Sequence, residues 1–512
     1  MSSFRNILVI TFDQWRADAR SGVAGGWVDT PHVARLAQRG VDFRNHVSVT
    51  IPCGPSRASL LTGLYATTHR SVGNGTPLSS RFDTLPAAVR RVGMRPVLFG
   101  YTDTTPDPTD RPATDPALTS YEGVMDGFDI GQVLLEDGGD WLAHLRDNGI
   151  DVPGPGYAIY QPTEPPAPGR RVSDAPCRVP AHLSETAFLA DRAIAFLEAP
   201  GPTPFLAHIS FLRPHPPFTA PAAFHDQVDP AAVPLPRPAP VVRHPFHQFL
   251  LDRTQLAAFV TGAEGLAHDL GERDVRRLRA SYAALVREVD HHLGRILETL
   301  DATGRAADTL VVLTSDHGEM LGEEGLWGKV GWWRESYHVP LIFAGAGLPD
   351  QAIGRVVDAP TESVDVMPTL LTLLGAPTPR QCEGRPLIRL MTGAPPADWR
   401  STQRMSFDFR DPIGRVAEDR FGLPSDACLG LVRRDPTWTY AHLPGQPPLL
   451  RRTPEERTLT PNCADDPEAR DVRLARAEAM LADALQSGDR SLVNLRVSPH
   501  GIIEAPDARR CP

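Results

Sequence analysis

Runs of consecutive apolar residues with no polar alternation are the strongest pattern along the chain. They are rich in β-branched residues and are typical of strands buried on both faces of a parallel sheet. These runs predict strands at residues 6–12, 41–47, 95–101, 205–211 and 309–315. Apolar residues that recur every three or four positions predict long helices at 183–198 and 274–300. Strands alternating with helices predict an α/β fold with a large mixed, mostly parallel sheet sandwiched by helices.

The pattern changes near residue 375. A helix at 364–374, for which Ser363 is the expected cap, ends there. Beyond it, short strand-like segments and a helix at 467–486 predict a small antiparallel sheet with a packing helix. We therefore expect a large catalytic α/β domain over residues 1–375 and a small C-terminal α+β subdomain over 376–512. The tail of that subdomain has an extended pattern that would suit contacts in a homo-oligomer.

Composition and charge exclude several classes of function. Lys and Arg total 52 against 62 Asp and Glu, a net charge of −10, which argues against nucleic acid or an anionic membrane as the partner. No apolar run approaches the roughly 20 residues of a membrane span. The six cysteines form no CxxC pair, so they predict neither a disulfide framework nor a zinc cluster. The first apolar run lacks a basic segment and a cleavage site. We expect a cytoplasmic protein.

Polar residues stand at the ends of three predicted strands. Asp13 and Gln14 follow the first strand, and Asp316 and His317 follow the strand at 309–315. Ligands bind beyond the carboxyl ends of strands in α/β sheets, so these four residues form a candidate divalent-metal site of mixed hardness, suited to Mn, Ca or Zn. Asp13 as a simple turn cap is the alternative. His215, held between prolines, is a candidate proton donor or an ordinary turn histidine.

A cysteine stands at the start of the helix predicted after residue 52. Pro55 suits the first helical position, which would leave Cys53 exposed at the positive end of the helix dipole. Arg57, one turn later, would add to a field that favours an anion. A small buried apolar residue is the alternative role for a lone cysteine. The proline and the arginine favour the functional interpretation.

The segment Cys53-Gly-Pro-Ser-Arg57, followed by Leu-Leu-Thr-Gly, resembles the sulfatase signature of the alkaline phosphatase superfamily. The resemblance implies an alkaline phosphatase/sulfatase-like fold. It also implies that a formylglycine-generating enzyme converts the cysteine to formylglycine, whose hydrated diol can release an ester by breaking its own C–O bond. It further implies one divalent metal, held by Asp13, Gln14, modified Cys53, Asp316 and His317. Arg57, His215 and Lys329 would be the other catalytic residues.

The pairs Asp-Gln and Asp-His, with segments such as 213–218 and 408–411, resemble the phosphonate monoester hydrolase and phosphodiesterase branch of this family. In that branch Asn74 and Tyr101 would line the substrate. Asp103 stands where the branch has a threonine that contacts the substrate. Because a carboxylate would repel an anionic ester, either the substrate differs or the Asp103 side chain turns away.

These patterns predict a formylglycine- and metal-dependent hydrolase of phosphonate monoesters and phosphodiesters, with sulfate monoesters as side substrates. The substrate would be a small anionic ester. A choline- or arylsulfatase is the alternative among enzymes, because choline sulfatases share the Asp-Gln and Asp-His pairs. An inactive relative that binds an anionic ligand or a partner in the same cleft is the alternative from another class.

Overall fold

The computed structural model describes residues 4–152, 154, 156–411, 413–453, 461–488, 495–499 and 501–504. Within these ranges the centre of the molecule is an eight-stranded sheet with the strand order β10-β2-β9-β8-β1-β7-β5-β6. Its strands are β1 (Asn6–Asp13), β2 (Gly40–Phe43), β5 (Arg95–Gly100), β6 (Asp129–Val133), β7 (Phe205–Pro214), β8 (Thr309–Ser315), β9 (Leu341–Gly345) and β10 (Arg355–Val357). Only β9 runs antiparallel to its neighbours in this sheet. The predicted mixed, mostly parallel sheet is confirmed.

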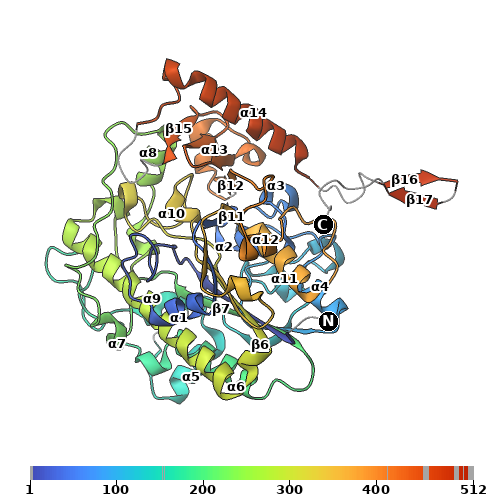
Figure 1. The fold of residues 1–512 in the computed structure, drawn as a ribbon. Coiled ribbons are helices and arrows are strands. Elements are labelled where there is room, and N and C mark those ends of the chain that lie inside the picture. Colours follow the sequence, from blue (N-terminus) through green and yellow to red (C-terminus); the bar gives the residue numbers. More distant parts are fainter. Residues whose placement is uncertain are drawn as a thin grey trace.

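Both faces of this sheet are covered by helices (Figure 1). The helices against one face are α1 (Pro31–Gln38), α6 (Glu185–Glu198) and α9 (Glu272–Ala302). Those against the other are α2 (Cys53–Thr62), α4 (Leu85–Arg91) and α11 (Val366–Leu374). Strand β1 serves both layers because its side chains alternate: Leu8 and Ile10 pack in the first, Ile7 and Val9 in the second. The central strands β1, β7 and β8 are therefore buried at every position.

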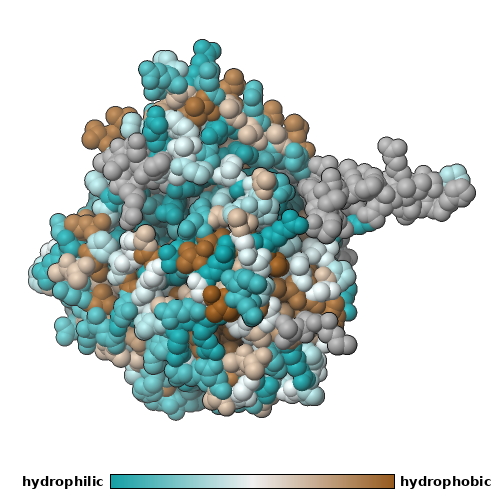
Figure 2. All heavy atoms as spheres, in the orientation of Figure 1, coloured by the Kyte–Doolittle hydropathy of each residue, from teal (hydrophilic) through white to brown (hydrophobic). Residues whose placement is uncertain are grey.

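The remaining helices are short, apart from α14. They are α3 (Ala66–His69), α5 (Gly139–Asp147), α7 (Ala222–His225), α8 (Pro245–Leu251), α10 (Arg334–Tyr337), α12 (Ile388–Thr392), α13 (Val416–Phe421) and α14 (Arg470–Gln486). Among the described residues, no helix has the length and apolar character needed to cross a membrane. Figure 2 shows apolar side chains scattered among polar ones, several of them over α14. The exposed leucines of α14 are Leu474, Leu481 and Leu485.

A second sheet joins the C-terminal part of the chain to the segment before Cys53. It contains β4 (Thr50–Ile51), β12 (Gln403–Asp408), β13 (Leu429–Arg434), β14 (Trp438–His442) and β15 (Leu449–Arg452). Strand β4 pairs in parallel with β12, while α14 packs on this sheet through Met480. The C-terminal strands thus hold the backbone that leads into α2. The domain boundary at residue 375 stays a prediction.

Two small pairs of strands complete the fold. Strand β3 (His46–Val47) pairs with β11 (Thr361–Glu362). Strands β16 (Leu495–Ser498) and β17 (Gly501–Glu504) form a hairpin that lies away from the rest of the chain (Figure 1). The predicted C-terminal tail falls mostly outside the described residues.

Two local predictions were wrong. The strand expected at 41–47 ends at Phe43, and His46 begins a strand in another sheet. Ser363 does not cap the following helix, because Glu362 and Asp365 form the capping box there. The Ser363 hydroxyl instead accepts a hydrogen bond from the backbone N–H of Val49 at 3.2 Å. Both differences involve contacts with residues distant in sequence: His46 pairs with Thr361, and Ser363 bonds to Val49.

Candidate active site

The carboxyl ends of β1 and β8 meet the first residue of α2. Asp13 ends β1, Asp316 and His317 follow β8, and Cys53 begins α2. The Cys53 Sγ lies 3.2 Å from His317 Nε2 and 3.9 Å from Asp13 Oδ1. One ligand atom from each of the four residues lies within 4.8 Å of the other three. The structure therefore brings together the two strand ends and the cysteine, as predicted.

This group fits a divalent metal ion. All four side chains are buried, and two carboxylates this close repel each other unless a cation lies between them. The hydrogen bonds of Asp13 involve one carboxylate oxygen and leave the other facing the remaining metal-ligand candidates. Asp13 Oδ2 accepts from Arg57 and Tyr101, which leaves Oδ1 toward Cys53 and His317. Oxygen and imidazole nitrogen donors suit the harder divalent ions.

Arg57 lies beneath the site rather than in its mouth. Its Nε donates to Asp316 Oδ2 at 3.0 Å, and its Nη2 donates to Asp13 Oδ2 at 3.1 Å. Only 1% of its side chain is exposed, and its guanidinium stacks on the Tyr101 ring at 4.4 Å. Although burial acts against the charged form, Asp316 raises the pKa of Arg57 well above its usual value. Arg57 therefore holds both carboxylates in place.

Cys53 differs from its expected setting in two respects. It is buried, not exposed, and α2 begins at Cys53 itself, so Pro55 is the third helical residue and not the first. Asn74 and the backbone of Asp103 lie against the next residue, Gly54. Burial, followed by the nearby Asp13, raises the pKa of the Cys53 thiol well above its usual value. A thiol that keeps its proton is a poor nucleophile.

Lys329 and His215 lie on the side of the site away from Arg57. The Lys329 Nζ donates to Gln14 Oε1 at 2.8 Å, and Cys53 and Asp13 raise its pKa despite the opposing effect of burial. Burial and then Lys329 lower the pKa of His215 to about 3, so its imidazole is neutral. Its Nδ1 lies 2.8 Å from the Pro216 carbonyl. Since a carbonyl only accepts, Nδ1 carries the proton and Nε2 is the acceptor.

The predicted substrate residues border the same site. The Asn74 Oδ1 accepts from the Gly54 N–H at 3.0 Å, and the Tyr101 hydroxyl donates to Asp13 Oδ2 at 2.7 Å. Asp103 is buried, and its carboxylate has no hydrogen-bond partner among the described residues. One of its oxygens lies 3.8 Å from Arg57 Nε. The side chain thus faces Arg57, and burial raises its pKa well above the usual value.

Sequence reasoning missed Glu319, which lies three residues after Asp316. Its carboxylate is buried and accepts hydrogen bonds from the Gln14 side chain and from two backbone N–H groups of its own loop. The signal was present, because an acidic residue follows His317 and Gly318 directly after a buried strand. A carboxylate in such a loop is usually solvated, and only the fold shows that this one is not.

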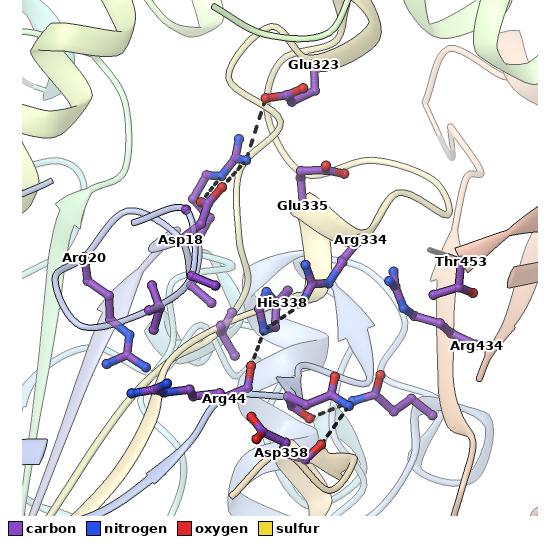
Figure 3. A pocket seen from close by; sticks show the side chains of 18 of the residues that line it. Asp18, Arg20, Arg44, Glu323, Arg334, Glu335, His338, Asp358, Arg434 and Thr453 are labelled. Carbon is purple, nitrogen blue, oxygen red and sulfur yellow. Dashed lines mark hydrogen bonds and ion pairs between the residues drawn. The ribbon is translucent and has the colours of Figure 1, made fainter. Parts of the chain in front are cut away.

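A separate cavity of about 730 Å³ opens beside this site. Figure 3 shows that charged side chains from several elements line it, among them Asp18, Glu323 and Arg334. None of the predicted site residues lines it. Arg16 forms ion pairs with Asp18 at 2.6 Å and with Glu323 at 3.7 Å along its wall. The cavity is thus bounded by paired charges.

The chain is similar to known proteins over nearly its whole length. The Sulfatase family model matches residues 5–376. The multifunctional alkaline phosphatase superfamily protein PehA of Trinickia caryophylli is 38% identical over 97% of this chain and 98% of its own. The crystal structure of the phosphonate monoester hydrolase of Agrobacterium radiobacter is 39% identical, with a TM-score of 0.93 over 98% of this chain and 100% of that one. A choline-sulfatase of Rhizobium meliloti is 29% identical over 72% of this chain and 67% of its own.

Proposed function

This chain belongs to the Sulfatase family, an ester-bond hydrolase family, and from that premise we propose that it hydrolyses phosphonate monoesters and phosphodiesters, with sulfate monoesters as side substrates. The observation that carries the proposal is the buried group of Asp13, Cys53, Asp316 and His317. The family match confirms the resemblance inferred from the Cys53 motif.

We propose that Asp13, Gln14, Cys53 as formylglycine, Asp316 and His317 hold one divalent ion, either Mn, Ca or Zn. When present, the metal and the hydrated aldehyde supply an activated hydroxyl nucleophile and a Lewis acid for a non-bridging oxygen of the ester. The protein positions these groups, because Arg57 fixes the outer oxygen of each carboxylate. The site is thereby organised before substrate arrives.

The mouth of the site would bind the ester through Asn74, Tyr101, Asp103, His215 and Lys329. Of the two candidate proton donors, Lys329 is protonated, whereas the proton of His215 lies on Nδ1 and faces the Pro216 carbonyl. We therefore assign protonation of the leaving alcohol to Lys329. The free Nε2 of His215 would accept a hydrogen bond from a protonated group of the substrate or nucleophile.

The charge of the site favours singly charged esters. One divalent ion, Arg57 and Lys329 supply positive charge, while Asp13, Asp316 and an ionised nucleophile oppose it. Asp103 adds little negative charge, because burial raises its pKa. A phosphodiester, a phosphonate monoester and a sulfate monoester each carry about one negative charge at neutral pH, whereas a phosphate monoester carries closer to two. A singly charged ester completes this balance.

Steady-state kinetics on the purified, formylglycine-bearing protein tests the substrate class. We expect higher kcat/KM for an aryl phenylphosphonate and a bis-aryl phosphodiester than for the matched aryl phosphate monoester, with the aryl sulfate also cleaved. A preference for the phosphate monoester, or activity on the sulfate alone, would contradict the proposal. Mass spectrometry of the peptide that contains Cys53 verifies the modification before any rate is compared.

We also propose that a formylglycine-generating enzyme modifies Cys53, and that the modified protein works in the cytoplasm as a homo-oligomer. Family membership supports the first proposal. The exposed leucines of α14 support the third, since apolar side chains on one helix are common at subunit contacts. Light scattering after size-exclusion chromatography checks the oligomer, and a monomer at micromolar concentration would refute it.

A further inference from the structure

Glu319 is a buried carboxylate that touches no substrate or metal ligand atom directly but lies one contact away. One of its oxygens, Oε1, accepts hydrogen bonds from the backbone N–H of Leu321 at 2.9 Å and of Gly328 at 2.7 Å. The other, Oε2, accepts from the side-chain amide of Gln14. The side chain is fully buried, so water does not compete for these bonds.

The two backbone contacts close the loop that ends at Lys329. They join one end of the loop, Leu321, to the other, Gly328. Leu321 and Glu324 have φ values of 50° and 53°, a left-handed conformation that costs energy for residues with a side chain. Because Lys329 follows Gly328 directly, the closure of this loop sets where the Lys329 ammonium lies.

The third contact fixes the orientation of the Gln14 amide. The Lys329 ammonium can only donate, so the Gln14 atom beside it must be the oxygen, and the NH₂ of Gln14 faces Glu319. The Gln14 oxygen then points the other way, where it accepts from Lys329 Nζ at 2.8 Å. The backbone N–H of Gln14 donates to Asp316 Oδ1 at 3.0 Å, which keeps the residue at the metal site. Glu319 and Lys329 thus select the same orientation of the amide from its two ends.

We propose that Glu319 is a positioning residue: it turns the Gln14 oxygen toward the metal and the Lys329 ammonium, and it sets the place of Lys329 by closing the loop. This role rests on the proposed function, which makes Gln14 a metal ligand and Lys329 the acid. A single carboxylate makes both sets of contacts. One of its oxygens accepts hydrogen bonds from two backbone N–H groups of the loop, and the other accepts from the side-chain amide of Gln14.

Glu319→Gln separates positioning from simple loop stability. The new side chain has the same shape, and its oxygen can still accept from Leu321 and Gly328. Its NH₂ then faces the NH₂ of Gln14. Either the two donors repel and displace Gln14, or Gln14 turns over and presents a donor to the metal and to Lys329. Metal affinity should fall while the loop stays closed. Partners that orient metal ligands typically contribute 10- to 100-fold to affinity.

The matched control is Glu323→Gln in the same loop. Glu323 is also buried and ion-paired, with Arg16 and Arg279, but none of its described contacts is with Gln14. Titration calorimetry with Mn²⁺ on chelated, formylglycine-bearing protein should show affinity about 10- to 100-fold weaker for Glu319→Gln. The control should bind Mn²⁺ within about 3-fold of the parent, even where its melting temperature falls. The double variant Gln14→Glu/Glu319→Gln restores a donor-acceptor pair and should recover affinity lost in Glu319→Gln.

Unchanged Mn²⁺ affinity in Glu319→Gln would overturn the proposal. Equal losses of affinity in Glu319→Gln and Glu323→Gln, in step with their melting temperatures, would also overturn it, because they would show a purely structural role. The titration uses no substrate, so a wrong substrate class would leave its result unaffected. The kcat and KM for an aryl phosphodiester complete the test: displaced Lys329 should lower kcat more than it changes KM.

Discussion

Two buried charge clusters lie next to each other in this molecule, and they are composed differently. One cluster, in the cavity wall, pairs three of its arginines with three of its acids: Arg16, Arg237 and Arg279 with Asp18, Glu323 and Glu335. The site cluster carries three aspartates, Asp13, Asp103 and Asp316, around Arg57, with Lys329 bound to Gln14. The first cluster neutralises itself. The second has a surplus of carboxylates at its centre and a lysine at its mouth, so it is completed only by a metal and an anionic ligand.

The difference also appears in individual atoms. In the cavity wall, Glu323 lies 3.4 Å from Arg279 and 3.7 Å from Arg16. In the site, both oxygens of Asp103 lack a hydrogen-bond partner among the described residues. A buried ion pair contributes little net stability, but breaking one by removing a single partner costs about 3–5 kcal/mol. Substitution should therefore damage stability in the first cluster and chemistry in the second.

The largest effect is expected for Cys53→Ala. Turnover of an aryl phosphodiester should fall by at least about 10⁴-fold, as for loss of a catalytic nucleophile, because no other described residue occupies that position. The melting temperature of the metal-free protein should change little, since the substitution removes only a small group at the end of one side chain. Cys177→Ala is the control: Cys177 is buried in the helix-covered core, so its loss should lower stability and leave turnover intact. Comparable multiple-turnover rates in Cys53→Ala would exclude it as the nucleophile.

The next effect concerns the metal. Chelation should abolish activity and lower the melting temperature, because the inward oxygens of Asp13 and Asp316 would then lack the metal, and Arg57 contacts only their outer oxygens. At a metal concentration of 100 times Kd, binding stabilises the fold by about 2.7 kcal/mol. Asp13→Asn should lose most of this metal-dependent increment in thermal unfolding.

Asp18→Asn tests the comparison between the two clusters from the side of the cavity wall. It leaves Arg16 with one acid fewer in the self-neutralising cluster, so the variant should unfold more easily with or without metal. Its metal-dependent increment should equal that of the parent.

The chelation prediction has its own contradicting outcome: metal-free parent protein, verified as such, with an unchanged melting temperature would contradict the role assigned to the site carboxylates.

Much of the fold was predictable because burial on both faces leaves a continuous apolar run. Strand β8 was predicted to the residue, at 309–315. Strands β6 and β9 were missed. The exposed positions of β6 give it no apolar run, and its strand conformation depends on pairing with β5. Local pattern identifies strands that are buried on both sides and overlooks those that a neighbour induces.

For the site, the residue types were predictable and the contacts were not. Asp13 and Asp316 were expected to meet because parallel strands present their carboxyl ends at one edge, and the family resemblance added Cys53. Their burial could not be predicted, since it depends on contacts between segments that lie far apart in the chain. The cavity wall went unnoticed for the same reason. Its arginines and acids come from scattered segments and carry no motif.

The smallest effect is a pH dependence of stability, and it should have opposite signs in the two clusters. Burial raises the pKa of Asp103 above its ordinary value of about 3.9. The folded protein therefore keeps a proton that the unfolded chain releases, and wild-type stability falls as pH rises above about 4. Asp103→Asn removes this dependence, so the free energy of unfolding of the parent minus that of the variant should fall with rising pH.

For Asp18 the sign is reversed. Burial alone would raise its pKa, but Arg16 lowers it below the ordinary value. The unfolded chain then binds the proton first as pH falls, so Asp18 contributes stability above about pH 4 and loses it below. The difference between the parent and Asp18→Asn should rise with pH. Urea unfolding at a series of pH values gives both curves on metal-loaded protein. Curves of the same sign would show that the two clusters do not differ in the way their contacts indicate, because both aspartates would then be ionised, or both protonated, in the folded state.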